Sequence, residues 1–376
     1  MSTEKWAFVA GGFGFLGQYI VWGLLRRGYS VVIGATKRST ITLEQHLNQF
    51  VKYNSLVNPA FHLEVGDMKR INVVECDIGK PNLGLSAAAQ TLVNQKSFAE
   101  VWNSAAYMKY DAKFYQKSYQ TNVAGTRNLM QFTSTFSQCV YCHISTAFAG
   151  GRKFSHGKLF EERIYEDDGG FFNSYDTTKA QAEKEVVAYC SSHDILHTIF
   201  RPTIIIGDST TGFTSSTFGF YEYLNAFNRL EKRIKGKNNR IIANGDSFLH
   251  IIPVDRCAEA ILSLTQRAKM KKNSIYTIAD KHPLTNRQML DLFSELFNTS
   301  FSCIKSPASD ETNRERLLRK FTARNQIFSL HSFNFSSTNT HSTIDQSICS
   351  DWPKNRDYFC MINEYFNQLN STNPQT

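Results

Sequence analysis

The feature that most constrains this chain is a glycine-spaced loop close to its N-terminus. A short apolar run, Trp6–Ala10, is followed by Gly11, Gly14 and Gly17, and a helical pattern begins at about Phe15. Glycines with this spacing allow a tight turn, a close approach of the backbone to a pyrophosphate and close packing of the helix on the strand. The positive end of that helix would face the phosphates. The segment therefore predicts a strand, turn and helix that bind a dinucleotide, although an ordinary tight turn is the alternative.

The same alternation of short β-rich runs and helical patterns continues as far as Pro202. The first helix ends at Arg26-Arg27-Gly28, where basic residues and a glycine suit a helix C-terminus. Repeated units of this kind build a parallel sheet covered by helices. We expect an α/β fold: a Rossmann-type doubly wound parallel sheet with a smaller C-terminal substrate-binding lobe. The predicted strands are Trp6–Ala10, Ser30–Ala35, Ile71–Glu75, Glu100–Asn103, Val140–Ile144 and His197–Phe200.

After Pro202 the alternation becomes less regular, which suggests a division of the chain. We expect residues 1–205 to form the dinucleotide-binding Rossmann domain and residues 206–376 to form mainly the substrate-binding lobe. Residues 251–280 should return to the Rossmann sheet through a strand at Ile275–Ala279.

The C-terminal part contains two segments with a helical pattern and, between them, a segment without a pattern of secondary structure. Thr285 and Gln288 form a capping-box pattern ahead of apolar positions at helical spacing. The segment 329–350 is rich in Ser, Thr, Asn and His, and we expect a loop or a poorly ordered stretch there. A last amphipathic helix is predicted from about Arg356 to Leu369.

The composition excludes several classes of protein. No uninterrupted apolar run reaches membrane-spanning length, and Trp6–Ala10 is too short for a secretion signal, so we expect a cytoplasmic protein. The eight cysteines are too scattered for a disulfide framework. Cys139 and Cys142 should face opposite sides of a strand, which argues against a metal or redox pair. We expect no metal site.

The formal net charge of +9 implies an acidic partner. Nucleotide phosphates, coenzyme A, a carrier protein and nucleic acid all meet that description, and charge does not choose among them. No block of Lys and Arg and no basic stripe interleaved with aromatic residues is present in the sequence. We therefore do not expect nucleic-acid binding.

The residues after the second and third strands bear on the choice of cofactor. Thr36-Lys37-Arg38 follows the second strand, where an acidic residue would hold the ribose 2′-hydroxyl of NAD. Cations at this place suit the 2′-phosphate, so NADPH is the expected cofactor, although Lys37 and Arg38 could also be a solvated loop pair. Asp77-Ile78 is placed to contact the adenine edge, or Asp77 only caps a turn.

Candidate catalytic residues lie on the predicted helix that follows the fifth strand. Tyr175 and Lys179 stand four residues apart, which puts both side chains on one helix face. An ammonium beside the phenol would lower the phenol pKa toward the working pH and make Tyr175 a usable proton donor or acceptor. A Tyr and a Lys at this spacing are usually a surface pair. Here it is their position, one strand and one loop after Ser145-Thr146, that indicates a catalytic role.

Thr146 closes the fifth strand, so its hydroxyl should point into the crevice at the carboxyl ends of the parallel strands. There it could hydrogen-bond a substrate carbonyl and the oxyanion that forms on hydride attack. A threonine that merely ends a strand is the alternative. Ser145 should face the other way and is the weaker candidate.

Taken together and in this order, these elements resemble the extended short-chain dehydrogenase/reductases. The matching segments are the glycine loop, Asp77, Asn103–Ala106, Asn122–Thr126, Ser145-Thr146, Tyr175 with Lys179, and Arg201-Pro202. Two further stretches resemble the thioester reductase and fatty acyl reductase branch. Cys76–Ser86 is similar to its GDxxxPxLGLS element and Ile206–Gly212 contains its GDSxTG element.

The branch implies reduction by NADPH of an acyl thioester, carried by coenzyme A or by a phosphopantetheine arm on an acidic carrier protein, to an aldehyde and in some members to the alcohol. The resemblance implies catalytic positions at Thr146, Tyr175 and Lys179, with Lys179 also holding the nicotinamide ribose. It implies cofactor contacts at Gly11, Phe13, Gly14, Phe15, Leu16, Gly17, Lys37, Arg38, Asp77, Ile78, Ser104, Ala105, Ala106, Asn122, Tyr175, Lys179, Pro202, Thr203 and Ile204. For Asn122 a structural role is an equal alternative.

Two residues depart from the branch pattern. Cys76 replaces the glycine of GDx, and Thr36 stands where many of these enzymes carry an arginine. Two other functions share the same elements: an epimerase, dehydratase or reductase of nucleotide sugars, and a non-catalytic NADP-binding protein. The LGLS and GDSTTG stretches favour the acyl reductase over the first, and the complete Thr, Tyr and Lys set favours an enzyme over the second.

Overall fold

A seven-stranded parallel sheet forms the centre of the molecule. The structure, a computed structural model, describes residues 4–36, 42–166, 169–268 and 273–372. The strand order is β12-β7-β5-β4-β1-β2-β3, and every neighbouring pair is parallel. The strands are β1 Trp6–Ala10, β2 Ser30–Ala35, β3 Ile71–Glu75, β4 Phe98–Asn103, β5 Val140–Ile144, β7 Leu196–Pro202 and β12 Ser274–Ile278. The predicted α/β class with a doubly wound parallel sheet is confirmed, and each predicted strand is present with its ends shifted by two residues at most.

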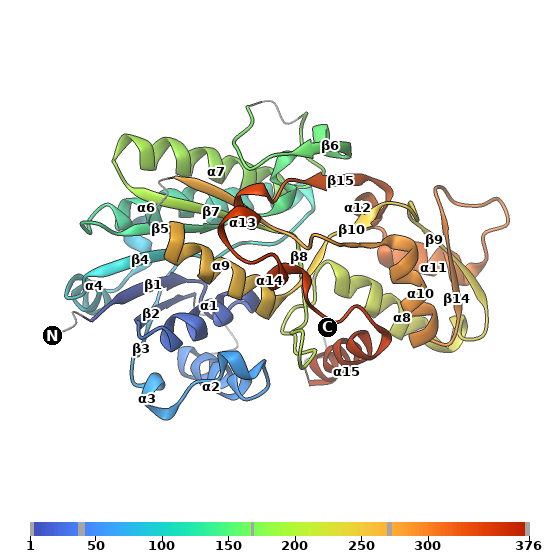
Figure 1. Cartoon of the computed structure of the whole chain (residues 1–376), viewed down its shortest axis with the longest axis horizontal. Coiled ribbons are helices and arrows are strands. Elements are labelled where there is room, and N and C mark those ends of the chain that lie inside the picture. Colours follow the sequence, from blue (N-terminus) through green and yellow to red (C-terminus); the bar gives the residue numbers. More distant parts are fainter. Residues whose placement is uncertain (1–3, 37–41, 167–168, 269–272, 373–376) are drawn as a thin grey trace.

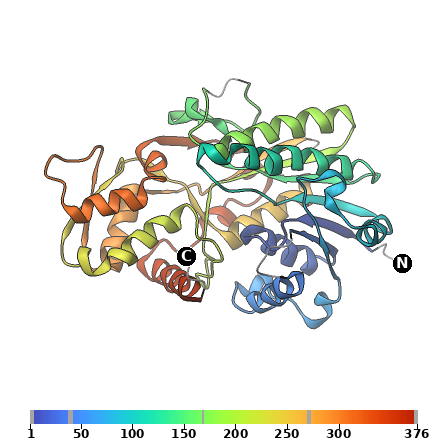
Figure 2. The ribbon, with the colours of Figure 1, turned by 180° about the vertical axis from the view of Figure 1, so that it is seen from behind.

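Chain order along the sheet reverses between β1 and β4, and the carboxyl ends of these strands leave a crevice where ligands bind in sheets of this kind. The helices that cover the sheet lie on both of its faces (Figures 1 and 2). They are α1 Phe15–Arg26, α2 Leu43–Asn54 and α9 Val254–Ala268 on one face, and α4 Ala87–Asn94, α6 Gly125–Thr133 and α7 Ser174–Ser192 on the other. Short helices α3 Val65–Met68 and α5 Tyr115–Tyr119 lie in connecting segments.

Alternate residues of the strands enter two different hydrophobic clusters. Val9, Ile33 and Cys142 pack with α1 and α9, whereas Phe8 and Tyr141 pack with α6 and α7. Because the side-chain period of a strand is two, a sheet covered on both faces requires apolar residues at consecutive positions. Cys139 also belongs to the second cluster, so it lies on the other side of the sheet from Cys142.

A second group of elements, which we call the distal lobe, lies at the carboxyl side of the sheet (Figure 1). It comprises α8 Phe220–Ile234, β9 Asn238–Ile242, α10 Asn286–Leu296, β14 Ser300–Ile304, α11 Asn313–Thr322, α12 Gln326–Leu330 and α15 Arg356–Thr372. The predicted capping box at Thr285 and Gln288 is present at the start of α10. Two-stranded pairs join the lobe to the sheet side: β8 Ile204–Ile206 with β11 Ile251–Pro253, β10 Phe248–Leu249 with β13 Leu284–Thr285, and β6 His156–Phe160 with β15 Ser332–Phe335.

The segment 329–350, which we expected to be a loop or poorly ordered, is structured, so that expectation is wrong. It contains the end of α12, β15, α13 Thr338–Thr343 and α14 Ser347–Ser350. The Thr340 hydroxyl donates to the Thr277 carbonyl at 2.8 Å, and the Asn339 amide donates to the Ile275 carbonyl at 3.0 Å. These polar side chains therefore provide hydrogen-bond donors to the carbonyls of the edge strand β12 and cover that edge. The last helix also continues three residues beyond the predicted end, to Thr372.

A buried ion pair attaches α7 to the sheet. Arg201, on β7, donates two hydrogen bonds to the Glu183 carboxylate at 2.9 and 2.6 Å, and both side chains are almost fully buried. The other guanidinium N–H groups donate to the carbonyls of Glu161 and Arg163 at 3.0 Å, and the group lies over the ring of Phe160. Full satisfaction of both charges is what makes such a buried pair tolerable.

We expect Glu183→Gln to lower the free energy of unfolding by about 3–5 kcal/mol, because it leaves the Arg201 charge buried without a counter-charge. Glu185→Gln is the matched control, since Glu185 lies on the same helix in a half-exposed pair with Arg127 and should cost less than about 1 kcal/mol. Urea unfolding followed by circular dichroism measures both. Equal losses in the two variants would contradict the role given to Arg201 and Glu183.

Candidate active site

The glycine loop forms a close backbone contact at the switch point of the sheet. Gly11 has φ +77°, and a Cβ there would lie 2.7 Å from the amide nitrogen of Ala105. A Cβ on Gly17 would lie 2.2 Å from the carbonyl oxygen of Gly11. The Gly14 amide donates to that same carbonyl at 2.9 Å. The loop is thus held against the end of β4 and the start of α1 at distances that only glycine permits.

The N-terminus of α1 fits a phosphate group. Gly14 is the N-cap residue and is exposed, and within the described ranges no side chain caps the helix. No acidic residue occupies its first turn. Since the first amides of a helix have no partner within it, these N–H groups can donate to an anion, as in dinucleotide-binding loops. The cradle therefore fits the pyrophosphate of a nicotinamide dinucleotide.

The other predicted residues of this loop and of the β4 end surround the cradle. Phe13 packs edge-on against His46 and Phe50, which supports the loop from the side of α2. Phe15 is half-buried and Leu16 is buried in the core. Ser104, Ala105 and Ala106 follow β4 directly, with the Ser104 amide donating to the Ala10 carbonyl at 3.0 Å and Ala106 exposed.

The predicted cofactor-contact residues that follow β2 and β3 differ in what the structure shows of them. Lys37 and Arg38 lie outside the described residues. Thr36 donates its hydroxyl to the Cys76 carbonyl at 3.0 Å, which ties the ends of β2 and β3 together. Asp77 accepts from the Gly79 amide at 3.0 Å, the turn-capping alternative, while its side chain stays partly exposed. Ile78 is buried and its carbonyl accepts from Asn128 at 2.8 Å.

Helix α7 brings Lys179 to the end of β5. The Lys179 amine is buried and donates to the Ile144 carbonyl, and it lies 3.5 Å from Nε2 of His143. Burial lowers the pKa of Lys179 to about 8, against the opposing effect of Glu183. Burial, together with Lys179, lowers the pKa of His143, so this imidazole is neutral.

Tyr175 lies one turn before Lys179 on the same helix, as the spacing predicts. Burial raises the pKa of its phenol, and the neighbouring Asp176 carboxyl raises it further. The expectation that Lys179 lowers this pKa is therefore wrong for this arrangement, because the amine is directed at β5 and burial dominates. The phenol is protonated at neutral pH and can act as a hydrogen-bond donor.

Thr146 follows β5 immediately and is the N-cap of a short helix at Ala147–Gly150 that packs against α7. Its Oγ1 accepts from the Phe148 amide at 3.3 Å, a long bond that leaves the hydroxyl proton available as a donor. Ser145 is buried, and its Oγ has no hydrogen-bond partner among the described residues.

Asn122 holds this site together from behind. Its Oδ1 accepts from the Tyr107 amide at 2.8 Å, and its Nδ2 donates to the Tyr107 carbonyl at 3.2 Å and to Thr178 Oγ1 at 3.0 Å. The amide thus joins the segment after β4 to α7, and its contacts are those of a structural residue.

The residues after β7 are engaged within the protein. Pro202 ends the strand, and Thr203 donates both its amide and its hydroxyl to the Ile278 carbonyl, at 3.1 and 3.3 Å. Ile204 begins β8 and lines an apolar cavity of the distal lobe.

The sequence analysis missed two aromatic residues of the site. The ring of Tyr110 lies 6.3 Å from the ring of Tyr175, and the ring of Phe148 lies 5.0 Å from that of Phe328 on α12. Phe148 lies soon after the end of β5, as Thr146 does, so the rule that placed Thr146 in the crevice could have found it, whereas Tyr110 lies well beyond the end of β4 and has no such signal. Only the fold shows that Phe328 joins them.

The GDSTTG stretch links the sheet side to the distal lobe. Asp208 accepts from the Tyr19 hydroxyl at 2.8 Å and from the amides of Asn58 and Thr210 at 2.9 Å. Asp255 of α9 accepts from the Ser209 amide and hydroxyl at 2.8 and 2.6 Å. Burial and the Asp255 charge raise the pKa of Asp208 to about 6. The motif is therefore a structural joint in this chain.

Comparisons with known proteins agree with this fold. The family described as Male sterility protein matches residues 9–261. The fatty acyl-CoA reductase wat of Drosophila melanogaster is 26% identical over an alignment of 294 positions, which covers 69% of this chain and 54% of the relative. The chain thus spans about half the length of this curated relative.

Solved structures share the fold at low identity. The terminal R domain of the myxalamid PKS-NRPS pathway superposes with a TM-score of 0.77 and 18% identity, over 97% of this chain and 91% of that one. The UDP-glucuronic acid 4-epimerase of Bacillus cereus in complex with NAD superposes with a TM-score of 0.66 and 15% identity, over 98% of each chain.

The fold and the dinucleotide cradle place the chain among the extended short-chain dehydrogenase/reductases, a class of oxidoreductases that use a nicotinamide cofactor. Within that class, the chain belongs to the family described as Male sterility protein. In the described part of the chain, no helix is both long and apolar enough to cross a membrane.

We expect Gly17→Ala to weaken binding of the nicotinamide cofactor at least about tenfold and to lower stability, because the added Cβ forces α1 away from the Gly11 carbonyl. Gly66→Ala is the control, since a Cβ at Gly66 in α3 meets no atom within 4 Å and should leave binding unchanged. Titration of NADPH fluorescence measures both. A tight complex with the Gly17 variant would show that the cradle does not hold the cofactor.

Proposed function

We propose that the chain is an NADPH-dependent reductase that converts an acyl thioester to an aldehyde. One observation carries the proposal: α7 and β5 bring Tyr175, Lys179 and Thr146 to the same edge of the sheet as the glycine cradle. In this reading residues 1–205, with 251–280, bind the cofactor, and most of 206–376 binds the substrate. The choice of NADPH over NADH rests on Lys37 and Arg38.

The bound nicotinamide would supply a hydride to the thioester carbonyl. The role of the protein is then to stabilise the oxyanion that develops on that carbonyl oxygen. Tyr175 is suited to donate to it because its raised pKa keeps the phenol protonated, and Thr146 has a hydroxyl proton to donate from the end of β5. Preorganised donors of this kind each lower a barrier by roughly 3 kcal/mol. Lys179 would orient the cofactor ribose, and the release of the thiol would leave the aldehyde.

The acyl substrate is supported by the relatives and by the lobe. A curated relative is a fatty acyl-CoA reductase, and the R domain of a biosynthetic assembly line shares the fold. The lobe contains an apolar cavity, which suits a hydrocarbon chain better than a sugar. Coenzyme A and a carrier protein are both suitable thioester carriers, and further reduction to the alcohol would use the same site.

The second candidate is an enzyme of nucleotide sugars, because the epimerase structure superposes over almost the whole chain. The decisive experiment follows NADPH oxidation with acyl-coenzyme A esters, acyl carrier proteins and nucleotide sugars in parallel. We expect NADPH consumption with the acyl thioesters. Consumption with the sugars alone would overturn the proposal, and binding of NADPH without turnover of any substrate would favour a non-catalytic protein.

We expect Tyr175→Phe to lower kcat by a factor of about 10²–10³, because it removes one oxyanion donor, and to leave the dissociation constant of NADPH nearly unchanged. Tyr115→Phe is the control, since the Tyr115 hydroxyl also contacts α7, through Gln181 at 3.3 Å, but lies outside the site. Steady-state kinetics and NADPH titration separate the two effects. An unchanged kcat in the Tyr175 variant would reject its assignment.

We expect the rate to fall above about pH 8, because the Lys179 amine, with its pKa lowered to about 8, loses its charge there. The groups that face it are His143 on β5, which is neutral, and Glu183 on α7, which favours the charged form. In Lys179→Arg the guanidinium stays charged, so the alkaline limb of the kcat profile should move up by more than about one pH unit, at a lower rate. The same alkaline limb in both proteins would exclude Lys179 as its origin.

A further inference from the structure

The Lys179 amine is buried without a counter-charge of its own. Lys179 is 2% exposed, and no carboxylate among the described residues forms an ion pair with it. Glu183, one turn further along α7, is engaged by Arg201 at 2.6 Å. A buried charge needs hydrogen-bond partners, so the amine depends on uncharged acceptors. The Ile144 carbonyl is one of them.

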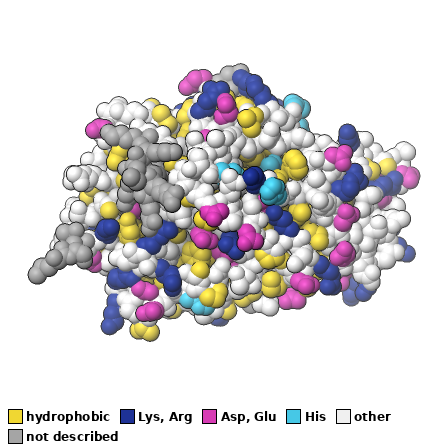
Figure 3. Space-filling model, viewed as in Figure 1, with side chains coloured by type: hydrophobic (Ala, Val, Ile, Leu, Met, Phe, Trp, Pro, Cys, Tyr) yellow, Lys and Arg dark blue, Asp and Glu magenta, His cyan; other side chains and the backbone are white. Residues whose placement is uncertain are grey.

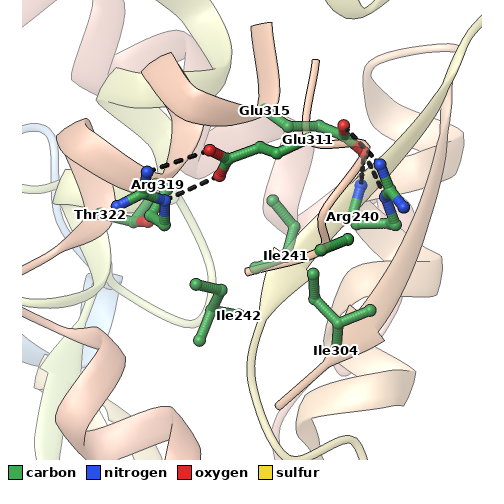
Figure 4. A pocket seen from close by; sticks show the side chains of 9 residues that line it. Arg240, Ile241, Ile242, Ile304, Glu311, Glu315, Arg319 and Thr322 are labelled. Atoms are coloured by element: carbon green, nitrogen blue, oxygen red, sulfur yellow. Dashed lines mark hydrogen bonds and ion pairs between the residues drawn. The ribbon is translucent and has the colours of Figure 1, made fainter. Parts of the chain in front are cut away.

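The arginines of the distal lobe are held differently (Figure 4). Arg240 pairs with Glu315 at 2.7 Å and Arg319 pairs with Glu311 at 2.7 Å, so each of these cations has its own carboxylate. The carboxylate favours the charged form of the cation and fixes its position. For Lys179, the groups that do this must be found among its uncharged neighbours.

His143 on β5 is a second uncharged neighbour of this amine. Its side chain is fully buried, and its Nε2 lies 3.5 Å from Lys179 Nζ. Its Nδ1 has no hydrogen-bond partner among the described residues. Burial and the charge of Lys179 lower the pKa of the imidazole, so the ring is neutral and has a proton on one nitrogen only. The Nε2 atom can accept from the amine only if that proton is on Nδ1.

The neighbouring strand β4 favours the proton on Nδ1. Asn103 is the register partner of His143, so both side chains lie on the same face of the sheet. The Asn103 Nδ2 donates to Thr126 Oγ1 at 2.9 Å and to the Tyr141 hydroxyl at 3.1 Å. Thr126 in turn donates its hydroxyl proton to the Asn122 carbonyl at 2.7 Å, so its oxygen must accept from Asn103. These bonds assign the remaining amide atom of Asn103, Oδ1, as an acceptor.

The Asn103 Oδ1 is buried and has no partner among the described residues, as is true of His143 Nδ1. Neighbouring strands lie about 4.8 Å apart, so an Nδ1–H group on His143 can donate to this oxygen directly or through one water molecule. An amide oxygen only accepts, and it therefore favours the tautomer of His143 that has its proton on Nδ1.

We propose that His143 is a positioning residue for Lys179: as its Nδ1–H tautomer, it presents the lone pair of Nε2 to the amine and holds it at the end of β5. The inference rests on the proposed function and adds to it a residue outside the set of Thr146, Tyr175 and Lys179. An ammonium group has three N–H donors. The Ile144 carbonyl and His143 accept two of them, and the third is left for the cofactor ribose.

The kinetic test compares two substitutions of His143. Phenylalanine fills the space of the imidazole without a lone pair, whereas glutamine places an amide oxygen near the position of Nε2. In His143→Phe the Lys179 amine loses an acceptor, so its pKa should fall and the alkaline limb of the kcat profile should move down by about one pH unit. In His143→Gln the alkaline limb should stay at its wild-type position.

His197→Phe is the matched control. His197 on β7 is also buried, and its Nδ1 lies 3.4 Å from the Ile195 carbonyl. Lys179 and His197 are the charged and titratable groups that act on His143, and Glu183 favours the charged form of Lys179. The control should leave the alkaline limb in place. A merely structural role of His143 would lower kcat at every pH without moving the limb, and that result in His143→Phe would overturn the inference.

A spectroscopic measurement separates this inference from the proposed function, because it needs no turnover. Nuclear magnetic resonance of protein labelled with ¹⁵N in its histidines distinguishes a protonated ring nitrogen from one with a lone pair, and the signals lost in His143→Gln assign His143. We expect a proton on Nδ1 alone from about pH 6 to about pH 8. If no acyl thioester is reduced but this tautomer is found, the proposed function fails and the role of His143 stands. A proton on Nε2 would overturn the inference, also if His143→Phe does not fold.

Discussion

The position of α7 against the sheet is the constraint on which the site depends. The proposed roles of Tyr175, Lys179 and Thr146 require this helix to lie at a fixed height over the end of β5. Three buried attachments set that height: Arg201 with Glu183, Lys179 with the Ile144 carbonyl, and Asn122 with Thr178.

Each attachment buries a polar or charged group that would be costly if it were left without a partner. The ion pair contributes less through its own strength than through the large penalty for breaking it. A shifted α7 would break the bonds of Arg201 to Glu183, of Lys179 to the Ile144 carbonyl and of Asn122 to Thr178 at once. The arrangement therefore restricts the helix to one register, as a preorganised site requires.

The distal lobe is joined to the sheet side by buried carboxylates and edge-strand contacts. Asp208 and Asp255 fasten the segment after β8 to α1 and α9, and the polar segment around Thr340 covers β12. On the face shown in Figure 3, Lys and Arg side chains are interspersed with Asp and Glu side chains, so the positive net charge is not gathered into one block there. These joints hold the distal lobe against the sheet side, where Phe328 packs against Tyr110 and Phe148.

The local sequence pattern predicted most of the strands of the sheet. It failed for features that depend on tertiary packing. The strands and the glycine loop follow from runs of apolar residues and from glycine spacing, which act over a few neighbouring positions. The segment 329–350 was misjudged because its Ser, Thr and Asn residues are typical of loops, whereas in the fold they satisfy a distant strand edge. The direction of the Tyr175 pKa was also misjudged, because burial depends on neighbours such as Tyr110 that come from other parts of the chain.

The sequence by itself determined the order of strands and helices, the dinucleotide loop and the placing of Tyr175 and Lys179 on one helix face, because short-range spacing controls each of these. Only the tertiary structure decided that Lys179 turns toward β5, that Phe328 of the lobe packs against Tyr110 and Phe148, and that the lobe contains an apolar pocket. These features depend on contacts between residues that are distant in the sequence, from 35 positions for Lys179 and Ile144 to more than two hundred for Tyr110 and Phe328, and such contacts form only when the chain has packed.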